Sequence, residues 1–230
     1  MDANLIYKIF IADSSWLTIL TGVWVTIEIS LLSIMVGTIL GAVICYFRMR
    51  ENKVLKSLAS FYISLLRGSP VLMLLMLLYY GVFARNFDPL TVAVIAFSMH
   101  TAAHVAELLR SAISATDYGQ IEAARTLGFS KIQAFRLVTL PQIFKISRPV
   151  YQSTVINLIQ WTSVVGYVSI TDLTRVIYNT ASRTMQPMIT IFGGMIIYLL
   201  ISYIVYGIFF LTNKREEEKE NERSLGEKSI

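Results

Sequence analysis

The chain has 230 residues, of which 55% are hydrophobic and 15% are charged, and its formal net charge is +5. A soluble domain usually carries about 25% charged residues, so this composition argues against a typical soluble enzyme and against a disordered protein. The single cysteine, Cys45, also excludes an intrachain disulfide scaffold. The composition is that of a polytopic membrane protein.

Five stretches of the chain are apolar over a length that can cross a membrane. An α-helix rises about 1.5 Å per residue, so about 20 apolar residues span the roughly 30 Å of hydrocarbon. We therefore predict an all-α membrane protein with five transmembrane helices, made of a membrane domain over residues 1–212 and a charged cytoplasmic tail over residues 213–230. The predicted spans are residues 17–47, 58–83, 90–113, 144–168 and 188–212.

The positions of Lys and Arg beside these spans predict the orientation of the chain. Fifteen of them fall on one side of the predicted membrane and four on the other, while Arg67 lies inside the second span. Because cytoplasmic loops carry the excess of positive charge, we expect the N-terminus outside and the C-terminus in the cytoplasm. The basic residues are spread over three loops that also carry acidic residues, so no nucleic-acid partner is expected.

The longest segment between spans, residues 114–143, lies on the predicted cytoplasmic side. Its strong helix formers predict a first helix that ends at Gly128, since glycine readily adopts the left-handed conformation found just after a helix. Ser130 can cap a second helix, and Pro141 is expected to end it. The small side chain of Ala123 suits insertion of the first helix into a groove on a partner protein.

A spaced motif runs through this loop. Glu122-Ala123-Ala124 is followed after three residues by Gly128, and after nine more by Val138-Thr139-Leu140-Pro141. The pattern resembles the hallmark of the permease subunits of bacterial ABC importers, in the polar amino-acid (histidine, glutamine or glutamate) branch, with Val in place of Ile. Other segments similar to that family, along residues 17–211, are Arg67-Gly68-Ser69-Pro70, Ala106-Glu107-Leu108-Leu109-Arg110, Thr162-Ser163 and Asp172-Leu173.

The resemblance implies the type I ABC importer permease fold in a bacterial plasma (inner) membrane. It also implies a coupling helix within residues 114–143, where Glu122, Ala123, Ala124 and Gly128 dock on ATPase subunits. Two ATPase subunits would bind ATP and Mg, a second permease subunit, identical or homologous, would complete the pathway, and an extracytoplasmic binding protein would deliver a polar amino acid. This chain has no Gly-x-x-x-x-Gly-Lys-Ser/Thr phosphate loop, so we expect it to bind no cofactor and to be no enzyme.

Among the charged residues inside the predicted spans, three stand out: Glu28, Arg67 and Glu107. Charges within a bilayer are costly and are candidates for function. We predict an ion pair between Arg67 and Glu107, with the i, i+3 pair of Glu107 and Arg110 as the competing arrangement. A structural role that holds helices together is favoured over a role in gating.

Polar side chains in the third and fourth spans are candidates for lining a substrate pathway. His100, His104 and Glu107 recur at i, i+4 and i+7 on one helical face. This spacing can hold a metal, but one membrane helix without a nearby cysteine favours pathway lining or helix contacts, and we predict no metal site. The fourth span contributes further candidates, for which hydrogen bonding between helices is the alternative: Asn157, Gln160, Trp161, Thr162 and Ser163. Many members of the resembled family have Lys-Asp at positions 160 and 161, so the chain departs from them at a central point.

Glycine and proline predict two features of the backbone. The pattern Gly37-x-x-x-Gly41 in the first span favours a close contact with another helix. Gly68 and Pro70 are expected to kink or interrupt the second span.

Two other functions compete with a permease. A secondary transporter driven by an ion gradient would use Glu28 or Glu107 as its proton or cation site and should contain inverted repeats, which we do not find. An intramembrane metal-dependent enzyme would rely on His100, His104 and Glu107. Neither alternative explains the motif in the cytoplasmic loop.

Overall fold

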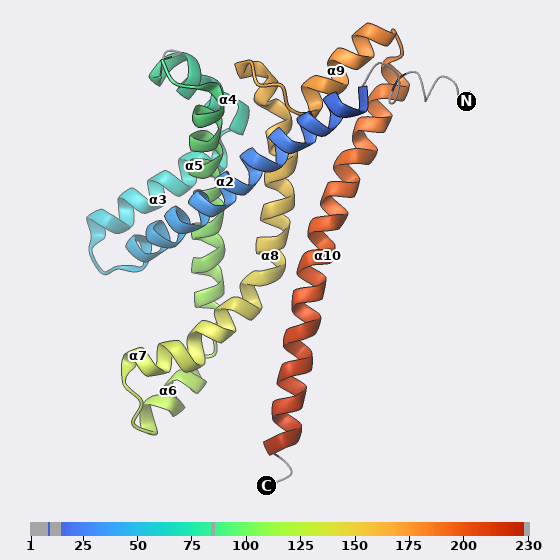
Figure 1. The fold of residues 1–230 in the computed structure, drawn as a ribbon. Coiled ribbons are helices and arrows are strands. Elements are labelled where there is room, and N and C mark those ends of the chain that lie inside the picture. Colours follow the sequence, from blue (N-terminus) through green and yellow to red (C-terminus); the bar gives the residue numbers. More distant parts are fainter. Residues whose placement is uncertain (1–8, 10–14, 84–85, 228–230) are drawn as a thin grey trace.

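The structure is a computed structural model that describes residues 9, 15–83 and 86–227. The regular elements of these residues are all helical, which confirms the predicted all-α class (Figure 1). In chain order they are α2 (Ser15–Met49), α3 (Lys53–Gly68), α4 (Val71–Met76), the π-helix η2 (Leu77–Val82), α5 (Pro89–Ser114), α6 (Tyr118–Thr126), α7 (Lys131–Ala134), the π-helix η3 (Phe135–Thr139), α8 (Leu140–Trp161), the 3-10 helix η4 (Thr162–Val168), α9 (Leu173–Thr184) and α10 (Pro187–Glu227).

The molecule has two distinct ends (Figure 1). Helices α6 and α7 lie at one end, near the C-terminus. The first turns of α2 and the whole of α9 lie at the opposite end, and α8 and α10 run from one end toward the other (Figure 1). The connection between α5 and α8 therefore lies at the opposite end of the molecule from α9 (Figure 1).

Within the described residues, three helices are individually long and apolar enough to cross a membrane: α2, α5 and α10. Helix α3 and the segment from α4 through η2 form a fourth candidate if they count as one span, because they meet at an angle of 107°. This break follows Arg67 and falls where Gly68 and Pro70 predict it. The fourth predicted span, residues 144–168, is covered by α8 and η4 but is not among these candidates, so the structure supports three or four spans and leaves the count of five a prediction.

Helix α5 is the centre of the fold. In its most apolar stretch 67% of the residues are buried, compared with 33% in α2 and 11% in α10. Small side chains along α5, among them Ala96, Ala102 and Ala103, are fully buried and allow its neighbours to approach closely. Phe97 belongs to the main apolar core, which also contains Leu75 from α4.

The predicted close contact at Gly37 and Gly41 is confirmed, and it joins α2 to α5. A Cβ atom at Gly41 would lie 2.7 Å from the Cβ of Val105, and one at Gly37 would lie 2.9 Å from the Cβ of Thr101. Both distances are too short for real side chains, so only glycine permits this approach. Helices α2 and α5 accordingly share the most extensive interface in the fold.

Helix α9 (Leu173–Thr184) is a short element that none of the apolar runs in the sequence indicates. Asp172 caps it by accepting hydrogen bonds from two amides of its first turn, at 3.0 and 3.1 Å. Thr26 of α2 accepts a hydrogen bond from the Leu173 amide at 3.3 Å, and Tyr198 of α10 donates to Asp172 at 3.3 Å. Burial raises the pKa of the Asp172 carboxyl above its ordinary value. This cap fixes α9 against both α2 and α10.

The contact at Gly41 predicts that Gly41→Leu destabilises the protein. The added side chain has to displace Val105 and the backbone of α5, and overpacking of this kind costs about 1–3 kcal/mol. Thermal unfolding of the purified protein in detergent should shift to lower temperature by several degrees. Gly207→Leu is the matched control, because nothing lies within 4 Å of a Cβ at that position. An equal shift for both variants would contradict the packing argument.

Candidate functional site

The segment between α5 and α8 folds into a sharply cornered pair of helices. Asp117 caps α6 by accepting a hydrogen bond from the Gly119 amide at 2.9 Å. At the other end, Gly128 has φ +88°, which confirms its predicted left-handed conformation. The amide of Gly128 donates to the carbonyl of Arg125 at 3.1 Å and that of Phe129 to the carbonyl of Ala124 at 3.2 Å. These two bonds form the Schellman arrangement that closes a helix on glycine.

The second helix begins at Ser130, as predicted. The Ser130 hydroxyl accepts from the Gln133 amide at 3.2 Å, while the Gln133 side chain accepts from the Ser130 amide at 2.8 Å. The prediction that Pro141 ends this helix is wrong, since α7, η3 and α8 continue without a loop. Pro141 lies at the start of α8, directly after the π-helical segment η3, so the irregular backbone that a proline imposes falls at the change from π-helix to α-helix and the helix does not end.

The outer surface of this corner is apolar as well as charged. Leu127 is 80% exposed and Ile132 is 67% exposed, although both are large apolar side chains at an end of the molecule. Glu122 and Ala123 are exposed beside them, whereas Ala124 is buried. An exposed apolar patch rimmed by charge is typical of a protein–protein contact. In this geometry Ala124 packs within the chain, while Glu122 and Ala123 remain accessible to a partner.

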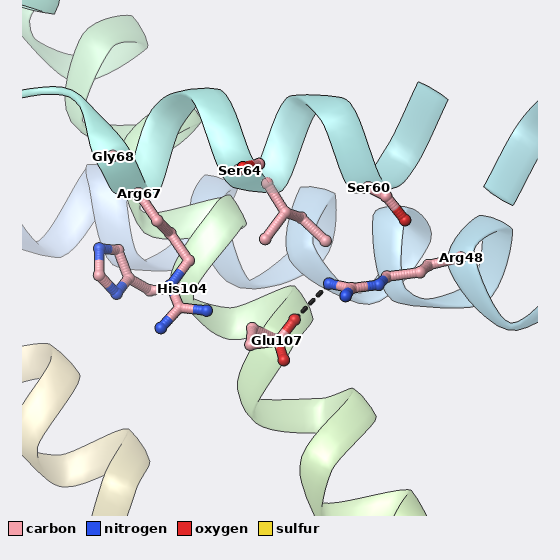
Figure 2. A pocket seen from close by; sticks show the side chains of 8 residues that line it. Arg48, Ser60, Ser64, Arg67, Gly68, His104 and Glu107 are labelled. Atoms are coloured by element: carbon pink, nitrogen blue, oxygen red, sulfur yellow. Dashed lines mark hydrogen bonds and ion pairs between the residues drawn. The ribbon is translucent and has the colours of Figure 1, made fainter. Parts of the chain in front are cut away.

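A polar cavity of about 400 Å³ lies between α2, α3 and α5 (Figure 2). It adjoins the corner where α3 ends, so it reaches the break in the second span. Figure 2 shows the guanidinium of Arg67 between the side chains of His104 and Glu107. The residues that line the cavity are Arg48, Ser60, Ile63, Ser64, Arg67, Gly68, His104 and Glu107.

Glu107 is the only acidic side chain lining the cavity, and it is shared by two arginines. One carboxylate oxygen pairs with Arg48 from the end of α2, and the other accepts from Arg110 at 2.6 Å, one turn along α5. The predicted Arg67–Glu107 ion pair is not among the ion pairs of the described residues. Arg110 competes locally, as anticipated, and the packing of α2 on α5 brings in Arg48, which no sequence spacing indicates. Arg67 still lines the same cavity.

The pathway candidates separate into groups. The rings of His100, His104 and Trp161 form a cluster in which the centroids lie 4.7 to 5.1 Å apart. Thr162 turns inward and donates to a backbone carbonyl of α8 at 2.7 Å, and Ser163 lines a second cavity. Asn157 and Gln160 are exposed on α8. Among the described residues, no group of three His, Cys, Asp or Glu side chains is placed to hold a metal ion.

An all-helical chain with several membrane helices, a capped two-helix loop at one end and a polar cavity between its spans has the architecture of a membrane transport subunit. A family model described as "Binding-protein-dependent transport system inner membrane component" matches residues 13–217. The chain belongs to this family. It is therefore a multi-pass inner membrane permease subunit, which operates with a binding protein and with ATPase subunits that bind the ATP.

Individual relatives agree with this assignment. The chain is 33% identical to the probable amino-acid ABC transporter permease protein YckA of Bacillus subtilis (strain 168) over 205 residues, covering 88% of each chain. It is 31% identical to the L-cystine transport system permease protein TcyB of the same organism, covering 87% of this chain and 84% of that protein. It is 28% identical to the histidine/lysine/arginine/ornithine transport system permease protein HisM of Salmonella typhimurium (strain LT2), covering 85% of this chain and 88% of HisM.

Solved structures show the same fold. A crystal structure of an amino acid ABC transporter with histidines aligns with a TM-score of 0.82 and 28% identity, over 94% of this chain and 100% of that chain. The MetNI methionine ABC transporter in an inward-facing form aligns with a TM-score of 0.76 over 89% of this chain and 99% of that chain, at 18% identity. The second likeness shows the fold alone.

The shared carboxylate predicts an energetic coupling between Arg48 and Glu107. The two side chains are 22% and 19% exposed, so solvent screens them only in part, and we expect a coupling energy of about 1 kcal/mol. Thermal unfolding of Arg48→Gln, Glu107→Gln and the double variant measures it. The control cycle replaces Arg50, which contacts Tyr46 and not Glu107. A coupling of zero for Arg48, or an equal one for Arg50, would refute the pair.

Proposed function

We propose that this chain is the transmembrane subunit of an ATP-driven importer that moves a polar amino acid delivered by an extracytoplasmic binding protein. The observation that carries this proposal is the similarity to permeases named for amino-acid transport along nearly the whole chain, including a structure with a TM-score of 0.82 over 94% of its length. Cystine and the basic amino acid histidine are the first substrates to test, since relatives are named for them.

The proposed topology has five spans, with the N-terminus outside and the C-terminus in the cytoplasm. The position of α6 and α7 near the C-terminus, with α9 at the far end, supports it (Figure 1). An outside N-terminus and an inside C-terminus require an odd number of crossings. If α2, α5, α10 and the bent pair each cross, α8 and η4 must supply the fifth. Residues 1–212 then form the membrane domain and residues 213–230 the cytoplasmic tail.

The exposed corner between α6 and α7 is the proposed docking surface for an ATPase subunit. Glu122 and Ala123 offer a charge and a small contact face, Gly128 sets the corner, and Ala124 holds α6 against the following helix. Two ATPase subunits and a second permease, identical or homologous, complete the proposed assembly. ATP-driven closure of the ATPase pair would move this corner and shift an equilibrium between inward-facing and outward-facing states.

The proposed solute pathway follows the polar side chains of α5 and α8. The ring cluster of His100, His104 and Trp161 stands beside the cavity that contains Arg67 and Glu107. Asn157 and Gln160 are exposed for contact with solute or with the second permease; Thr162 and Ser163 mark the end of α8.

The docking surface predicts that Ala123→Trp uncouples the transporter. The indole cannot enter the contact that an exposed methyl group occupies, so we expect the binding-protein-stimulated ATPase activity and the uptake to fall at least about tenfold, equivalent to about 1.4 kcal/mol of lost contact. Ala115→Trp is the matched control, because Ala115 is also exposed but lies after α5, outside α6. Normal activity of Ala123→Trp in an assembled complex would remove the assignment.

Reconstitution tests the importer itself. Proteoliposomes that contain this permease, its ATPase and its binding protein should accumulate labelled histidine or cystine only when ATP is supplied on the cytoplasmic side. A protonophore should leave this uptake unchanged. Uptake that continues without ATP and stops with the protonophore would instead indicate the ion-gradient transporter, with Glu28 or Glu107 as its cation site.

A further inference from the structure

A second cavity, of about 570 Å³, lies at the end of the molecule opposite to α6 and α7. It is formed by η4, by the turn after it and by the first half of α9. Its volume falls in the range of about 300–1,000 Å³ that is typical of small-molecule sites. The aromatic side chains of Tyr167 and Tyr178 line it and are 62% and 66% exposed.

Arg175 is the only charged side chain among the residues lining this cavity. One of its terminal nitrogens donates to the carbonyl of Gly166 at 3.4 Å, and its other guanidinium donors have no hydrogen-bond or ion-pair partner among the described residues. The nearest carboxylate in sequence, Asp172, is buried and accepts from two backbone amides and from Tyr198. The charge of Arg175 is therefore not neutralised by Asp172, and the guanidinium is available to an anion.

The other polar groups of the cavity are hydroxyls. Ser163, Tyr178 and Ser169 line it together with Arg175. Ser169 has φ 67°, a left-handed conformation that is uncommon for a residue with a side chain. Ser169 is the C-cap of η4, and this conformation turns the chain from η4 toward α9 along the edge of the cavity. The guanidinium can bind the carboxylate of a small molecule. The hydroxyls and the two tyrosine rings can contact the rest of that molecule.

We propose that this cavity binds the transported amino acid at the outer end of the pathway, with Arg175 bound to its carboxylate. The assignment rests on the proposed function and orientation, which put this end of the chain toward the binding protein. All amino acids carry this carboxylate, so binding by Arg175 would not depend on which side chain the binding protein selects. Ser163 belongs to the lining, which connects the cavity to the end of α8.

The test uses the complete transporter in proteoliposomes and a ¹⁴C-labelled mixture of the twenty amino acids with cystine. The measured quantity is the ratio of amino acid taken up to ATP hydrolysed, with the loaded binding protein present. In Arg175→Ala the binding protein still docks and stimulates hydrolysis, but the carboxylate loses its charged partner, so the ratio should fall about tenfold. Arg175→Lys should restore part of it, and Arg175→Glu should lower it further.

Two further variants test whether a fall in the ratio is specific to the proposed site. Arg183→Ala is the matched control, because Arg183 lies on the same helix but donates to Ser15 and lines a different cavity. Tyr178→Phe removes only an exposed hydroxyl of the proposed site, so it keeps the proposal testable if Arg175→Ala fails to assemble. Its ratio should fall by about two- to tenfold.

Three results would overturn the proposal. The first is a wild-type ratio in Arg175→Glu, and the second is an equal fall in Arg183→Ala. The third is a parallel loss of uptake and stimulated hydrolysis at a constant ratio, which would make Arg175 a contact for the binding protein. Absence of uptake of every amino acid by the wild-type transporter would overturn the proposed function and this assignment with it.

Discussion

The close approach of α2 to α5 at Gly37 and Gly41 is the constraint on which the rest of the structure depends. Lipid tails are as apolar as leucine, so helices in a membrane associate through tight packing rather than through exclusion of water. Two glycines allow the backbones to meet where any side chain would collide. Arg48 follows Gly41 by about two turns, so this packing also places its guanidinium on Glu107 of α5.

Carboxylates and guanidinium groups have different roles at the two cavities. In the cavity between α2, α3 and α5 one carboxylate, Glu107, pairs with two arginines, and Arg67 adds a further positive charge to the lining. At the end of the molecule that carries α9, Asp172 is committed to capping that helix, and Arg175 keeps its charge facing the second cavity. Asp172 thus organises the backbone of α9, and Glu107 joins α2 to α5. The guanidinium groups of Arg67 and Arg175 line the two cavities.

Much of the fold could be predicted from features that are local in the sequence. The apolar runs located the helices, Gly128 and Ser130 predicted the corner between α6 and α7, and Gly68 with Pro70 indicated the break in the second span. The pairing of Glu107 with Arg48 was not predicted because Arg48 lies on another helix. Residue spacing along one helix cannot indicate a contact between two helices. Helix α9 was missed because its twelve residues are amphipathic rather than continuously apolar. Whether an amphipathic segment of this length forms a helix depends on the neighbouring helices against which its apolar face packs.

The 107° corner between α3 and α4 has an electrical consequence. Backbone groups that lose helical partners inside a bilayer need polar surroundings, and a polar cavity lies beside Gly68. Where such a polar recess enters a membrane, the voltage falls across the remaining apolar layer rather than across the full hydrocarbon thickness of about 30 Å. Each elementary charge that crosses that layer gains or loses about 2.3 kcal/mol per 100 mV over a shorter path.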